Sequence, residues 1–127
     1  MVKYAMISRD VVQLTSSGTY APGEWDSVLD AVRNDPAVPD GARLIIDSRQ
    51  LDVRMSSVQL IDRIKNLARR LGPKMGTACA MVVSPENAVL SFQFRDFAEG
   101  LIALRIGVFT EMEDAKRWLT PSPEPTF

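Results

Sequence analysis

The fold class is decided by residues 42–84, which read ARLIIDSRQLDVRMSSVQLIDRIKNLARRLGPKMGTACAMVVS. The run Leu44–Ile46 has the uninterrupted apolar character of a strand that is buried on both faces. Apolar residues then recur at helical spacing until a Gly-Pro pair, which stops a helix. Residues 78–83 form a second apolar run of strand length. The stretch therefore predicts a strand that ends at Asp47, a polar loop, an amphipathic helix and a second buried strand.

The sequence on either side extends this alternation of strands and helices. The further predicted elements are a strand at residues 3–8, a strand at 11–15, a helix from Pro22 to Asn34, a helix from Pro85 to about Glu99, a strand at 103–109 and a final helix opened by the capping-box sequence Thr110–Glu113. Residues 16–19 and 48–55 are predicted to be loops. The order predicts an α/β domain with a mixed five-stranded sheet. Its first two strands form an antiparallel hairpin, and right-handed βαβ crossovers join the later ones.

Length and charge narrow the classes of protein to which the chain can belong. With 127 residues we expect a single domain over residues 1–119, followed by a mobile Pro-rich tail at 120–127. A formal net charge of -1 gives no electrostatic reason to bind nucleic acid. No segment has the ~20 apolar residues of a transmembrane helix, and no signal peptide is recognisable at the N-terminus. We therefore expect a cytoplasmic protein.

The residue types that most often carry catalysis are scarce. The chain contains no histidine, which excludes Ser-His-Asp and Cys-His mechanisms as well as zinc sites that use histidine. The single cysteine, Cys79, lies in the apolar run of the second buried strand and is expected to be a core residue. No cofactor or metal is therefore expected. An enzyme that works through carboxylates remains a third hypothesis, behind two binding functions.

Several short motifs resemble those of a known superfamily. They are Glu24-Trp25, Arg43–Asp47, Val108–Thr110, Glu113–Ala115 and Trp118-Leu119. In this pattern the chain resembles small bacterial single-domain proteins of the STAS-like superfamily. That superfamily includes sulfate-transporter and anti-sigma-factor-antagonist domains, and its fold is a neighbour of the CRAL-TRIO lipid-transfer domains. The resemblance implies a STAS-like fold and a non-enzymatic regulatory or protein-interaction module with a protein partner.

Two adjacent serines match the regulatory position of that superfamily. In anti-sigma-factor antagonists a helix begins with Asp-Ser-Ser-Gly, and a partner kinase phosphorylates the first serine. The matching stretch here is Met55–Val58, in which Ser56 and Ser57 are kept while methionine and valine replace the aspartate and the glycine. The alternative is that Ser56 only caps the helix, in a capping box with Gln59.

Charged residues follow the first buried strand at the edge where α/β sheets usually bind ligands. Asp47, Ser48 and Arg49 come directly after the strand, and Arg54 lies close to the serines. Both arginines are suited to a phosphate or to an acidic partner. The stretch from Asp47 to Ser57 is therefore the candidate binding surface. The alternative is that Asp47 only pairs with a neighbouring arginine or with loop amides.

Three phenylalanines, Phe92, Phe94 and Phe97, lie within six residues of the third predicted helix. They are candidates to line a pocket for a small apolar ligand or a lipid, in the manner of a carrier or sensor. The alternative is core packing. Three aromatic residues so close together cannot all face one side of a helix, and Phe94 is the one expected to point away, towards a membrane surface or a second copy of the chain. A homodimer is compatible with the sequence.

Overall fold

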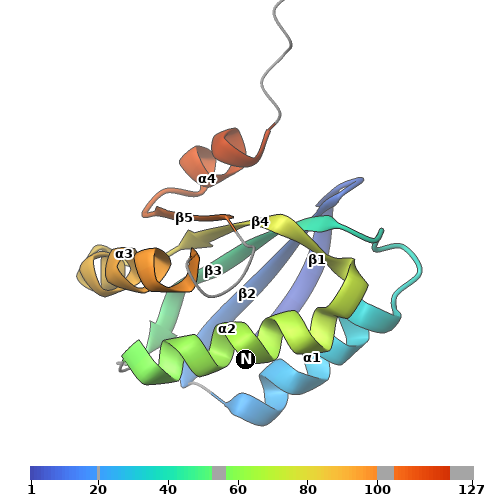
Figure 1. Cartoon of the computed structure of the whole chain (residues 1–127), viewed down its shortest axis with the longest axis horizontal. Coiled ribbons are helices and arrows are strands. Elements are labelled where there is room, and N and C mark those ends of the chain that lie inside the picture. Colours follow the sequence, from blue (N-terminus) through green and yellow to red (C-terminus); the bar gives the residue numbers. More distant parts are fainter. Residues whose placement is uncertain (20, 53–56, 100–104, 121–127) are drawn as a thin grey trace, which may run out of the picture.

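After an N-terminal hairpin of two strands, helices and strands alternate along the rest of the chain (Figure 1). The computed structural model describes residues 1–19, 21–52, 57–99 and 105–120. The elements are β1 (Val2–Ser8), β2 (Val11–Thr19), α1 (Pro22–Asn34), β3 (Ala42–Asp52), α2 (Ser57–Leu71), a 3-10 turn (Gly72–Lys74), β4 (Met75–Val82), α3 (Pro85–Glu99), β5 (Arg105–Phe109) and α4 (Met112–Leu119).

The sheet has five strands in the order β1-β2-β3-β4-β5. β1 and β2 pair antiparallel across the two-residue turn Arg9-Asp10, and the other neighbouring strands pair in parallel. The predicted mixed five-stranded sheet with an N-terminal hairpin is thus confirmed. Because the strand order follows the chain, β1 and β5 are the two edges of the sheet.

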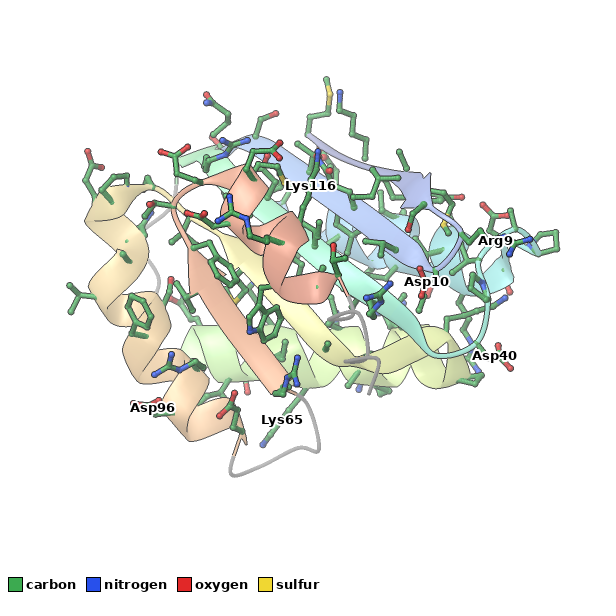
Figure 2. The ribbon with its side chains drawn as sticks, turned by 90° about the horizontal axis from the view of Figure 1, so that it is seen from above. Arg9, Asp10, Asp40, Lys65, Asp96 and Lys116 are labelled. Carbon is green, nitrogen blue, oxygen red and sulfur yellow. The ribbon has the colours of Figure 1, made fainter. Side chains whose placement is uncertain are left out.

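The two faces of the sheet are covered unequally. In Figure 1, α1 and α2 lie together on one face, and α4 lies on the opposite face. The larger apolar cluster fills the first face, where Leu29 and Val32 of α1 and Leu67 of α2 pack against Leu14 and Leu44 of the sheet. α4 covers β3, β4 and β5 but leaves β1 and most of β2 open, as Figure 2 shows.

Helix boundaries follow local sequence signals. α1 begins at Pro22 and ends at Asn34, as predicted, because proline suits a first turn. α2 ends at Leu71, and the next residue, Gly72, has a φ of +53° in the left-handed region where glycine is favoured. α3 also has its predicted bounds, Pro85 and Glu99. No helix in the described part of the chain is both long enough and apolar enough to cross a membrane.

Three local predictions were wrong. β2 continues to Thr19 and β3 to Asp52, through stretches predicted to be loops, because the two strands pair with each other along this polar extension. Hydrogen bonding between the strands outweighs the low strand propensity of Gly18 and Asp52. The capping box before α4 does not form either. The N-cap residue is Glu111, one position later than predicted, and no side chain bonds to the cap.

Candidate functional site

The parallel pairing of β2 and β3 is interrupted by a bulge at the candidate binding residues. Thr15 is opposite Asp47, whereas Ser17 is opposite Gln50, so β3 has one more residue than β2 between these two pairs. Ser48 and Arg49 lie in this extra length of strand. Bulges redirect side chains and often occur beside functional sites. Residues 48–52 therefore form a strand and not the predicted loop, but the strand is irregular at the positions where the charged residues lie.

The carboxylate of Asp47 holds the bulge in place. Its Oδ1 accepts hydrogen bonds from the backbone N–H of Arg49 at 3.2 Å and from the Arg49 Nε at 3.0 Å. Its Oδ2 accepts a third bond from the Arg49 Nη2 at 2.9 Å. One carboxylate thus binds both the main chain and the guanidinium of Arg49, a two-pronged geometry that fixes the arginine's orientation. The structure thus shows the predicted pairing of Asp47 with a neighbouring arginine.

Burial and pairing act in opposite directions on Asp47. Its side chain is only 10% exposed, and this burial on its own raises the pKa of the carboxyl. The hydrogen bonds from the side chain and the amide of Arg49 outweigh burial and leave the pKa of Asp47 below its usual value. The pKa of Arg49 is raised, mainly by its bond to Asp47, with a smaller contribution from the charge of Glu111.

The charge of Glu111 also acts on Arg49, which the sequence did not reveal. Glu111 lies between β5 and α4, far from Arg49 along the chain, and its side chain is exposed. Its charge acts on Arg49 because β3 and α4 are neighbours in the fold. The side chain of Arg49 is 37% exposed, whereas the carboxylate that it binds, that of Asp47, is buried. No motif in the sequence connects residues 49 and 111.

The buried hydroxyl of Ser16 lies next to the bulge. Ser16 stands between Thr15 and Ser17, directly opposite the extra length of β3, and is 1% exposed. Its Oγ has no hydrogen-bond partner, although buried polar atoms are almost always paired. The interior beside the bulge therefore contains an unsatisfied polar group.

The other predicted site residues are only partly covered by the structure. Ser57 is the first residue of α2, while Ser56 and Arg54 lie outside the described residues, as does the matching of the serines to a phosphorylation site. On α3, Phe92 is 42% exposed, and the guanidinium of Arg95 lies 5.0 Å from the centre of its ring. The side chains of Phe94 and Phe97 lie outside what the structure describes.

A groove lies on the other side of the molecule from α3, at the open part of the α4 face. Its volume is about 360 Å³, and it is lined by Ile7, Ser8, Val11, Arg43, Ile45, Lys116, Leu119 and Thr120. Figure 2 shows Lys116 on α4 and Asp10 in the turn between β1 and β2. Arg43, which lines the groove, donates two hydrogen bonds of 2.9 Å to the carboxylate of Asp10 and another to the carbonyl oxygen of Leu119.

The ion pair at the bulge predicts a dependence of stability on pH. Because the pKa of Asp47 is lowered in the folded state, its pairing stabilises the fold fully above the unfolded-state pKa of about 3.9. This contribution is lost as the pH falls through the folded-state pKa. Urea unfolding at about pH 6 and about pH 3 should therefore show a larger loss of stability for the wild type than for Asp47→Asn. Parallel losses in the two proteins would contradict the assignment.

Comparison with known proteins identifies the fold. Neither a protein-family model nor a curated protein sequence matches this chain. Among solved structures, the chain is similar to the crystal structure of an anti-sigma factor antagonist from Mycobacterium paratuberculosis, with a TM-score of 0.62. The match covers 94% of this chain and 92% of that chain, at 15% sequence identity. At this identity the likeness establishes the fold, and the chain therefore has the STAS-like fold that its sequence predicts.

Proposed function

We propose that this chain is a non-enzymatic regulatory module that binds a protein partner through the surface around Arg49 and Glu111. The observation that carries the proposal is the Asp47–Arg49 pair, built on a bulge of a chain whose fold is that of an anti-sigma factor antagonist. The partner class that this likeness suggests is an anti-sigma factor.

The geometry of Arg49 suits it to a protein interface. Asp47 already fixes the guanidinium, so little side-chain entropy remains to be lost when a partner binds. The guanidinium also keeps N–H groups that can donate to a partner's carboxylate or carbonyl oxygens, since part of it is exposed. Arginine is enriched at protein interfaces for these reasons. Exposed Glu111, whose charge acts on Arg49, adds an acceptor of the opposite charge to the proposed surface.

The chemistry of the chain supports a binding role rather than a catalytic one. The sequence has no histidine that could act as a general base near neutral pH. Cys79 is fully buried, and burial raises the pKa of its thiol to about 12, so the reactive thiolate is not formed. Asp47 and Arg49 are bound to each other, and side chains held in this way suit a fixed recognition surface better than proton transfer.

Binding to purified anti-sigma factors of the organism that carries this gene tests the proposal. We expect isothermal titration to detect binding to one of them, and Arg49→Gln to weaken it by about tenfold or more, as expected for a central interface arginine. The matched control is Arg9→Gln, the same change in the turn between β1 and β2, which should leave affinity unchanged.

A second variant separates binding from folding. Arg49→Gln leaves the carboxylate of Asp47 buried without its guanidinium, which can destabilise the fold. The double variant Asp47→Asn with Arg49→Gln removes that charge and should lose affinity to the same extent. Wild-type protein that binds none of the anti-sigma factors, or variants that bind as tightly as wild type, would refute the proposal.

The groove beside α4 supports no second function. Its main cation, Arg43, is already engaged by Asp10 and by the carbonyl of Leu119. Lys116 faces Glu113 at 3.8 Å. A small apolar ligand with an acidic group would have to displace these contacts. The groove is therefore the open end of the smaller apolar cluster rather than a prepared ligand site.

A further inference from the structure

The two edges of the sheet differ in a way that points to a partner for β1. The β5 edge is covered, because α3 packs against β5 and the carboxylate of Glu99 accepts a hydrogen bond from the backbone N–H of Ile106 at 3.0 Å. Within the residues that the structure describes, no strand pairs with the outer edge of β1. Figure 1 shows β1 at the end of the sheet, away from α3 and α4. An exposed strand edge is a template for another strand.

The hydrogen-bond pattern of the hairpin shows which groups of β1 point outward. Met1 exchanges backbone hydrogen bonds with Ser17, so the residues of β1 that bond to β2 are the odd-numbered ones. The N–H and C=O groups of Val2, Tyr4 and Met6 therefore face away from β2. The regular pairing ends after Met6, where the register shifts. The outward-facing, regular part of the edge runs from Val2 to Met6, and Tyr4 is its centre.

An antiparallel copy of the same segment fits this edge. If Tyr4 pairs with Tyr4 of a second chain, Val2 lies opposite Met6, and every outward N–H and C=O of the regular segment finds a partner. Such a two-fold pairing is self-complementary, as an isologous dimer requires. It places exposed Met1 opposite exposed Ile7, and these are two of the large apolar side chains left in solvent. The edge also carries no proline and only one charge, Lys3.

We infer that this chain forms a two-fold dimer through β1, which joins two sheets into one continuous sheet. The pairing is antiparallel and centred on Tyr4. The occupant of the edge is a second copy of the chain, and not the partner proposed for Arg49, because Arg49 lies on β3 and β2 separates that strand from the β1 edge. The interface is short by the standards of stable complexes, so the dimer is expected to exchange with monomer as concentration changes.

Sedimentation equilibrium on the full chain tests the dimer and its register together. In the Tyr4-centred register, Ala5 of one chain lies opposite Lys3 of the other, and both side chains are exposed. Ala5→Lys then creates two facing pairs of like charge, whereas Ala5→Glu creates two facing pairs of opposite charge. We expect Ala5→Lys to weaken the dimer by roughly tenfold and Ala5→Glu to keep or strengthen it. Val89→Lys, on the exposed surface of α3, is the matched control and should have no effect.

Each result decides for or against the proposal. A wild-type mass that rises with concentration towards that of two chains, together with opposite effects of the two Ala5 variants, supports it. A monomer at every concentration up to roughly 1 mM overturns it. A dimer that both Ala5 variants weaken equally, or that neither affects, also overturns it, because another register or another surface would then hold the two chains together. Thermal melts of each variant confirm that the monomer is folded.

Discussion

Gly76→Ala is expected to destabilise the protein by about 3 kcal/mol or more, because the space for a side chain at this position is occupied by backbone. A Cβ on Gly76 would lie 2.5 Å from the carbonyl oxygen of Gly41 and 2.7 Å from that of Ala42. These are backbone atoms of the first residue of β3 and of the residue before it, and they cannot rotate away as a flexible side chain would. The substitution therefore forces β4 away from β3.

Chemical denaturation monitored by circular dichroism measures this effect. The matched control is Gly23→Ala in α1, where an added Cβ meets no atom within 4 Å. Alanine is the better helix former, so this variant should be neutral or more stable by up to about 1 kcal/mol. Two variants of similar stability would show that β3 and β4 do not approach each other as closely as the structure has them.

The close approach at Gly76 is an example of a feature that cannot be predicted from the sequence, namely the relative position of two paired strands. The pairing of β3 with β4 is irregular here, since Ala42 is opposite Met75 but Leu44 is opposite Cys79. The sequence predicted both strands from their apolar runs, but their relative position is a property of the pair. A glycine in a strand indicates a bulge or a close contact without saying with what.

The helices were more predictable than the strand ends for a physical reason. The bounds of α1 and α3 depend on proline and on apolar periodicity, which are local signals. The outer halves of β2 and β3 are polar, and they are strands because they bond to each other, with Gly18 opposite Leu51 and Thr19 opposite Asp52. Such pairing joins residues more than thirty positions apart and leaves no periodic trace in either segment.

The candidate site likewise combines contacts between residues close in sequence with contacts that depend on the fold. Asp47 and Arg49 are two residues apart, so their association was accessible to sequence reasoning, and the structure confirms it as one of the two alternatives. The bulge that unites them depends on the register with β2. Glu111 and Ser16 come from other elements, and only the assembled fold lets the charge of Glu111 act on Arg49 and places Ser16 opposite the bulge. Sequence reasoning thus reached the local contacts of the candidate site and missed those that depend on the fold.

Leu44→Ala is expected to cost about 4 kcal/mol of unfolding free energy, near the upper end for truncation of a buried leucine. Leu44 is 1% exposed, lies on the central strand and belongs to the cluster that α1 and α2 cover. Helices close this face of the sheet, so the surroundings cannot collapse into the space that the missing atoms leave. Guanidinium chloride unfolding gives the stability of the variant relative to wild type.

Ile45→Ala is the matched comparison, because it removes a similar side chain from the neighbouring residue on the opposite face. Ile45 is also fully buried, but it lines the groove beside α4. Truncation there enlarges a space that is already open to solvent, so less packing is lost and the expected cost is about 2 kcal/mol. Equal costs, or a larger cost at Ile45, would show that α4 closes its face as completely as α1 and α2 close theirs. The difference between these adjacent residues therefore measures how unequally the two faces of the sheet are covered.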